Sequence, residues 1–335
     1  MLKLDENTRF SEIWEAEEFR EFRDYFIVNM DLLNDPNFGR TLGEIDTDSW
    51  SMKGLIKGLL RLQEMIRRGH HMIPISTEEE RAKDPLFEKT GFLYFPSDDP
   101  AADTKPYIMV VPGGAYTNVW NLTEGYPVAA HFNELGYHAF IMSYRVNNVN
   151  AKIFPEGGLM PRPLDDLAQA FKIIRERKAE FRVDPDKYLI TGFSAGGSLV
   201  SLWCDTRHGY PCYGIPKPQA VFPVYPVVSW RQLAEVRNYD GFSMATIGLT
   251  LKEAAESDWN AEDNVQGFPP AYIVLTADDD LVPPEQSKVL ARALDAAGIP
   301  NVLEIGEKGG HGFAEGWKAD TCGWIERAAA FAEKA

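Results

Sequence analysis

The chain has 335 residues, of which 44% are hydrophobic and 12% aromatic, enough for one large domain with a sizeable core. Its formal net charge is −16. Such an acidic surface repels nucleic acids and anionic membranes, so we expect neither as a partner. The three cysteines, Cys204, Cys212 and Cys322, form no C-x-x-C pair, which argues against a disulfide framework or a zinc site.

The first residues, Met-Leu-Lys-Leu-Asp-Glu-Asn, are polar and contain no apolar stretch typical of a signal peptide. No run elsewhere approaches the ~18 apolar residues of a membrane-spanning helix. We therefore expect a soluble, cytoplasmic protein. The sequence leaves the oligomeric state open, with a homo-oligomer among the alternatives.

Residues 1–80 are rich in charge, poor in glycine and carry apolar side chains at helical spacing. Two such stripes, 13–26 and 55–66, are separated by the turn-rich stretch 35–39. This pattern predicts an N-terminal helical appendage of two or three helices whose aromatic stripe is buried. A lid and an interaction module are the roles considered for it.

From about residue 85, short apolar runs alternate with amphipathic stretches. This alternation predicts an α/β catalytic domain over 85–335, with a mostly parallel sheet covered by helices on both faces. Residues 229–265 interrupt the alternation and predict either a cap over the site or an ordinary pair of surface loops. The predicted strands are 107–111, 138–144, 188–191, 221–224, 271–275 and 302–305, and the predicted helices are 127–135, 163–178, 198–203, 284–298 and 318–333.

The strand predicted at 188–191 runs into Gly-Phe-Ser-Ala-Gly-Gly at 192–197. A Gly-x-Ser-x-Gly turn between a strand and a helix holds the serine hydroxyl at the tip of a sharp bend, where it can attack a carbonyl. Ser194 is therefore a candidate nucleophile. For the motif alone, the structural alternative is a glycine-rich turn with a helix-capping serine.

Two later strands end in residues that a serine nucleophile requires. The strand at 271–275 runs into three aspartates at 278–280, and the strand at 302–305 runs into a glycine-rich loop with His311. His311 could accept the serine proton, while a buried carboxylate would orient the imidazole. Because adjacent carboxylates repel one another, not all three aspartates are expected to be buried, and the residues alone do not show which one is. The other histidines, expected to be structural or solvated, are His70, His71, His131, His138 and His208.

The strand at 107–111 runs into Pro-Gly-Gly-Ala-Tyr at 112–116. The two glycines free backbone N–H groups to point into the site, where they could form an oxyanion hole with the N–H of Ala195. No metal-ligand spacing, phosphate-binding loop or dinucleotide motif occurs in the sequence, so we expect no metal and no cofactor.

As a set, these motifs resemble the α/β-hydrolase superfamily, and most closely its acetyl esterases, xylan esterases and hormone-sensitive-lipase-like carboxylesterases. The resemblance covers about residues 90–333. It implies an α/β-hydrolase fold with Ser194 as nucleophile, His311 as base and Asp279 as acid. Asp279 is chosen because the family's acid lies three residues before a valine, here Val282. The segments that carry the resemblance are 112–116, 124–129, 140–146, 161–166, 192–197, 279–283 and 310–313.

The resemblance also implies oxyanion donors at Gly114, Ala115 and Ala195. Many relatives have His-Gly-Gly-Gly where this chain has Pro112 and Ala115. Alanine keeps its N–H group, so the hole survives with slightly less room for the backbone.

The activity that the resemblance implies is that of a serine carboxylic ester hydrolase, working through an acyl-enzyme on short acyl esters. Acetyl esters come first, with carbohydrate esters as one substrate class. Tyr116, Trp120 and Trp230 are candidate substrate-binding residues, with a place in the core as the alternative for the two tryptophans. Two alternatives stay open: an amide or peptide hydrolase of the formamidase or exopeptidase type, and a catalytically silent relative that binds a partner through the appendage.

Overall fold

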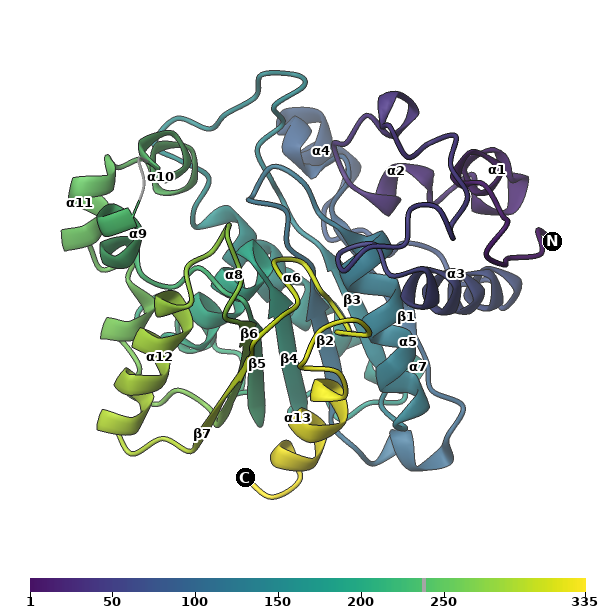
Figure 1. Ribbon diagram of the computed structural model, residues 1–335. Helices are drawn as coiled ribbons and strands as arrows, with labels where there is room; N and C mark the ends of the chain where they lie inside the picture. Colours follow the sequence, from purple (N-terminus) through teal and green to yellow (C-terminus); the bar gives the residue numbers. More distant parts are fainter. Residues whose placement is uncertain (237–238) are drawn as a thin grey trace.

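The computed structural model describes residues 1–236 and 239–335. A seven-stranded sheet runs through the middle of the molecule, in the order β1-β3-β2-β4-β5-β6-β7 (Figure 1). Only β1 is antiparallel to its neighbour. The predicted α/β architecture is therefore confirmed. The strands are β1 (Gly91–Phe95), β2 (Tyr107–Val111), β3 (Ala139–Ser143), β4 (Tyr188–Phe193), β5 (Ala220–Val224), β6 (Ala271–Thr276) and β7 (Asn301–Gly306).

Side chains alternate along each strand, so the sheet has one apolar core on each face. In β2, Tyr107 and Met109 belong to one core, while Ile108 and Val110 belong to the other. The first core is closed by α6 (Arg162–Glu176), α8 (Ala195–Cys204) and α12 (Glu285–Ala296), and the second by α5 (Tyr126–Glu134) and α13 (Trp324–Ala332). A short α7 (Lys178–Phe181) follows α6.

Most of the buried N-terminal residues pack on the second face, whereas Val28 and Ile75 belong to the first core. Phe10 and Phe26 belong to the same apolar core as Ile108 of β2, so this segment and the sheet share one core. Gly58 of α3 lets that helix lie against α5, because a Cβ there would come within 2.7 Å of the Pro127 nitrogen. The boundary predicted near residue 80 stays a prediction. The helices here are α1 (Phe10–Glu15), α2 (Arg23–Phe26), α3 (Met52–Arg67) and α4 (Glu78–Lys83).

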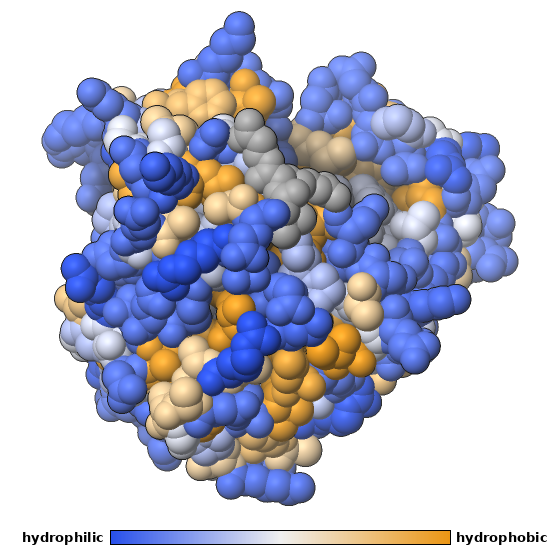
Figure 2. Space-filling view, turned by 60° about the vertical axis from the view of Figure 1, so that its left-hand side comes forward, coloured by the Kyte–Doolittle hydropathy of each residue, from blue (hydrophilic) through white to orange (hydrophobic). Residues whose placement is uncertain are grey.

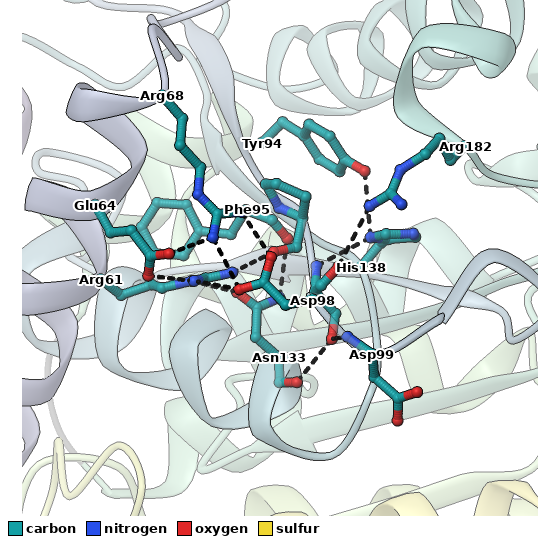
Figure 3. A network of polar contacts seen from close by, with 12 residues as sticks. Arg61, Glu64, Arg68, Tyr94, Phe95, Asp98, Asp99, Asn133, His138 and Arg182 are labelled. Carbon is teal, nitrogen blue, oxygen red and sulfur yellow. Dashed lines mark hydrogen bonds and ion pairs between the residues drawn. The ribbon is translucent and has the colours of Figure 1, made fainter. Parts of the chain in front are cut away.

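Polar contacts hold α3 to the rest of the domain (Figure 3). Arg68, the residue that caps the C-terminus of α3, donates to Asp98, in the loop after β1, at 2.7 Å. Arg61, within α3, donates to Asn133 of α5 at 3.0 Å. Asn133 in turn donates to the carbonyl of Phe95. Polar contacts thus join α3 and its cap to α5 and to the loop after β1.

Strand β1 is absent from the predicted elements. All five of its residues are buried, as in the predicted strand β2, so its run Phe-Leu-Tyr-Phe was an apolar signal of the same kind. The predicted helix 318–333 begins later, at Trp324, after Gly323 in the left-handed conformation. The first predicted stripe, 13–26, is divided between α1, a short 3₁₀ turn (Glu17–Phe19) and α2.

The excursion at 229–265 forms three short helices above α12, namely α9 (Trp230–Val236), α10 (Asp240–Ile247) and α11 (Leu251–Glu256) (Figure 1). Residues 237–238 of this segment lie outside the described residues. The Tyr239 hydroxyl donates to the carbonyl of Leu281 at 3.1 Å, so the excursion touches the loop after β6. Its role as a cap stays a prediction.

Figure 2 shows a surface that is mostly hydrophilic, with apolar side chains in smaller groups between the charged ones. Few large apolar residues are more than two-fifths exposed; they include Met244 on α10 and Ile305 on β7. Among the helices that the structure describes, none combines the length and apolar character needed to cross a bilayer.

Candidate active site

Ser194 lies in the sharp turn between β4 and α8. Its backbone has φ 51° and ψ −117°, a strained conformation for a residue with a side chain. A Cβ at Gly196 would collide with the carbonyl oxygen of Val111, and one at Gly192 would collide with that of Gly196. The two glycines are therefore required for α8 to start close against β2 and β4, which leaves the serine at the tip of the turn.

The structure brings the three predicted catalytic side chains into one hydrogen-bonded chain. His311 Nε2 lies 2.9 Å from Ser194 Oγ, and His311 Nδ1 lies 2.7 Å from Asp279 Oδ2. Asp279 is buried, and its Oδ1 accepts the N–H groups of Leu281 at 3.0 Å and Val282 at 2.8 Å. Both carboxylate oxygens are thus held in place, with one aimed at the imidazole.

Of the two neighbouring aspartates, Asp278 bonds to the backbone of the histidine loop. Asp278 accepts the N–H groups of Gly310 at 2.9 Å and Gly309 at 3.3 Å. These bonds, that to Gly310 foremost, lower the pKa of Asp278 and tie the histidine loop to the loop after β6. Asp280 is exposed and lines the mouth of the pocket described below.

The loop after β2 contains the predicted oxyanion donors. The N–H of Gly113 is occupied, because it donates to Glu124 at 2.6 Å. Those of Gly114 and Ala115 donate to no acceptor in the described chain, and Ala195 is the first residue of α8, where an N–H has no intrahelical acceptor. Gly114 has φ 131°, and a Cβ there would collide with the carbonyl of Asn118, so glycine is required.

A pocket of about 540 Å³ opens above Ser194. Gly114, Ala115, Ser194 and His311 lie in its wall, as does Trp120, one of the three predicted substrate residues. The rest of the wall comes from Ser49, Thr117, Asn118, Thr123, Glu124, Asp280, Leu281 and Gly312.

Tyr116 and Trp230 do not line this pocket. Tyr116 is 1% exposed and packs against Tyr144, with ring centroids 6.2 Å apart. Trp230 is 6% exposed and packs against Phe242 of α10 at 5.4 Å. Both therefore belong to the buried core, which was the alternative for Trp230 only.

Three residues at the site have roles that the sequence did not predict. Ser49, in the N-terminal segment, donates to the backbone carbonyl of His311 at 2.8 Å. Glu124 accepts from the oxyanion loop, and the ring of Tyr225 lies 4.7 Å from that of His311. Tyr225 directly follows β5 and has a positive φ of 37°. Its position at the end of a predicted strand was the sequence signal that could have indicated it.

Within residues 1–236 and 239–335, no group of three or more His, Cys, Asp or Glu side chains could hold a metal ion.

Comparison with known proteins identifies the family whose sequences this chain resembles. The BD-FAE family model matches residues 93–294. The chain is 30% identical over 242 residues to endo-1,4-beta-xylanase B of Butyrivibrio fibrisolvens, which covers 68% of this chain and 36% of that protein. It is 29% identical over 217 residues to an acetylxylan esterase of Xylanibacter ruminicola, covering 62% of this chain and 41% of the relative. The chain thus spans less than half the length of these two relatives.

Solved structures share the fold. The acetyl ester-xyloside bifunctional hydrolase from Caldicellulosiruptor lactoaceticus superposes with a TM-score of 0.61 at 26% identity, covering 78% of this chain and 94% of that one. MGS-M1, an α/β hydrolase from a deep-sea metagenome library, has a TM-score of 0.58 at 22% identity, with 79% and 96% covered. The predicted α/β-hydrolase fold is confirmed.

Proposed function

Because the chain belongs to the BD-FAE family and has an α/β-hydrolase fold, we propose that it is a serine carboxylic ester hydrolase working through an acyl-enzyme. The observation that carries the proposal is the hydrogen-bonded chain from Asp279 through His311 to Ser194, with distances of 2.7 and 2.9 Å, at the wall of an open pocket.

In the proposed reaction, Ser194 Oγ attacks the ester carbonyl while His311 Nε2 takes the hydroxyl proton. The oxyanion that forms is held by the N–H groups of Gly114, Ala115 and Ala195, and each such donor contributes roughly 3–4 kcal/mol to stabilising the transition state. His311 returns the proton to the leaving alcohol, and the acyl group stays on the serine. A water molecule, deprotonated by His311, then releases the acid and regenerates the hydroxyl.

We further propose that the acyl group is short, acetyl first, and that the alcohol is a carbohydrate. Two similar proteins are named for xylan or its acetyl esters. The pocket wall also suits a sugar, since it combines the indole of Trp120 with the polar side chains of Thr117 and Asn118.

The test compares the wild type with Ser194→Ala on p-nitrophenyl esters of increasing acyl length, on acetylated xylo-oligosaccharides and on matched amides. We expect the wild type to favour acetyl esters over longer esters and over amides, and the variant to lose activity with its fold intact. Near-normal turnover by the folded variant would exclude the serine mechanism. A preference for amides would favour the formamidase-like alternative.

A further inference from the structure

Glu124 is a buried carboxylate at the active site that forms no ion pair with the described residues, although the charge of His311 acts on it. Five Asp and Glu residues of the described chain are less than a tenth exposed. Asp166 pairs with Arg145, Glu315 with Lys57 and His131, Asp205 with His208, and Asp279 with His311. Glu124, 6% exposed, forms no ion pair with any residue that the structure describes.

Such an arrangement is costly, because burial of a carboxylate is normally compensated by a cation. Burial raises the pKa of Glu124, and the hydrogen bonds from Gly113 and Tyr225 and the charge of His311 oppose this effect. A costly buried acid that lines an active-site pocket calls for an explanation beyond packing.

The hydrogen bonds of Glu124 connect the two loops on which the proposed chemistry depends. Glu124 Oε2 accepts the N–H of Gly113 at 2.6 Å, in the peptide directly before the oxyanion donor Gly114. Glu124 Oε1 accepts the hydroxyl of Tyr225 at 2.9 Å. That hydroxyl accepts the N–H of Ala314 at 3.1 Å, three residues beyond His311.

Tyr225 also contacts the base itself. Its ring centroid lies 4.7 Å from that of His311 and 4.7 Å from that of Phe313. The tyrosine is buried, so its ring forms one wall behind the imidazole, while its hydroxyl joins Glu124 to the histidine loop.

An uncommon backbone feature presents Glu124 to this position. Residues Asn121–Gly125 form one turn of π-helix before α5, and all five are buried. Single π-helical turns are rare in proteins as a whole, and those that occur are often found at functional sites. Here the turn directs the Glu124 side chain back toward the loop from which the helix emerges.

We propose that Glu124 is a positioning residue of the active site, which together with Tyr225 locks the oxyanion loop to the loop that carries His311. Gly113 donates its N–H to the carboxylate, which fixes the following peptides so that Gly114 and Ala115 present theirs to the substrate. The base is fixed by the same pair through Ala314 and the tyrosine ring. This inference rests on the proposed function.

The first test is steady-state kinetics of Glu124→Gln and Tyr225→Phe on p-nitrophenyl acetate. Since misplacement by about 1 Å can cost about 100-fold in rate, we expect kcat to fall roughly 10- to 100-fold, with KM changed less than about threefold. Because the two residues act as one unit, the double variant should lie within about threefold of the worse single variant. Multiplicative losses, or unchanged kcat in both single variants, would overturn the proposal.

The matched control is Asp166→Asn. This change removes the carboxylate of Asp166, which is only 1% exposed and does not line the pocket at Ser194. We expect it to lower the melting temperature and to leave kcat of the folded enzyme near the wild-type value. An equal loss of kcat in this control would assign the Glu124 effect to general destabilisation.

A second measurement separates positioning from structure. A trifluoromethyl ketone forms a tetrahedral adduct with the serine, so its affinity reports the oxyanion hole and base together. We expect its affinity to fall in parallel with kcat in both variants. If wild-type protein neither hydrolyses the ester nor reacts with a fluorophosphonate, the proposed function fails. If the wild type does both and Glu124→Gln binds the ketone normally, only this inference fails.

The pH dependence of stability provides a third readout. Because the pKa of Glu124 is raised in the folded state, the native protein binds this proton more tightly than the unfolded chain does. The resulting stabilisation is present below the unfolded pKa and is lost as the pH rises through the folded pKa. The melting temperature of the wild type minus that of Glu124→Gln should therefore decrease from about pH 4 to about pH 8. A difference that grows with pH would contradict the burial argument.

Discussion

Replacing Asp279 by asparagine should disable the base while leaving its surroundings in place. Oδ1 of Asp279 accepts two backbone N–H groups, from Leu281 and Val282, whereas Oδ2 faces His311 Nδ1. An asparagine oxygen would take the Oδ1 place, because the two N–H donors point at it. The NH₂ group would then face Nδ1 of His311, so the imidazole must carry its proton on Nε2 and cannot accept one from Ser194.

The expected loss of kcat follows from this change of imidazole tautomer. In serine triads, the same change lowers kcat by about 10⁴-fold, which corresponds to about 5 kcal/mol of transition-state stabilisation. Asp278→Asn and Asp280→Asn serve as matched controls. Asp278 accepts backbone N–H groups, which an asparagine oxygen can also accept, and Asp280 is exposed, so we expect each to cost less than about tenfold.

The assay is kcat/KM on p-nitrophenyl acetate, with thermal unfolding monitored by circular dichroism for all three variants. The reasoning is refuted if Asp279→Asn keeps activity within about tenfold of the wild type. It is also refuted if Asp278→Asn gives the largest loss, which would assign the acid to the neighbouring position.

Two further predictions concern the N-terminal segment. Ser49→Ala removes the hydrogen bond to the His311 carbonyl, which contributes about 1 kcal/mol. Its loss should lower kcat/KM roughly fivefold and change the melting temperature little. Unchanged kinetics would show that the bond does not position the base. Gly58→Ala places a Cβ 2.7 Å from the Pro127 nitrogen and should lower the free energy of unfolding by about 1–3 kcal/mol, whereas Gly39→Ala, with open space around its Cβ, should be nearly neutral in the same denaturant titration. Equal stability of the two glycine variants would contradict the close packing of α3 on α5.

The sequence predicted a feature correctly where that feature accepts only certain residue types, such as apolar residues in buried strands and glycine in tight turns. Apolar runs predicted six of the seven strands, because buried parallel strands are continuous stretches of apolar residues. The turn around Ser194 was recognisable because only glycine fits beside it. The left-handed position at Gly114 could be anticipated for the same reason.

Other features depend on distant contacts that no local pattern shows. Three adjacent aspartates look alike in the sequence, and only the resemblance favoured Asp279, whose carboxylate contacts His311. Ser49 reaches the histidine loop from a position 262 residues earlier in the chain. Glu124 resembles any acidic residue near a helix start, because neither its burial nor its bond to Gly113 is local information.

Aromatic residues were the least predictable. Trp120 and Trp230 are equally plausible pocket residues in the sequence, yet Trp120 lines the pocket and Trp230 packs under α10. Their difference is set by how the excursion at 229–265 folds, which composition alone does not determine.

Labelling with a fluorophosphonate probe tests the central claim most directly, since the probe reacts only with a serine activated by a neighbouring base. We predict that the wild type is modified on the peptide that contains Ser194, that Ser194→Ala is not modified, and that the probe competes with p-nitrophenyl acetate. A folded wild-type protein that fails to react, or a Ser194→Ala variant that reacts equally fast, would contradict the assignment of Ser194 as the nucleophile.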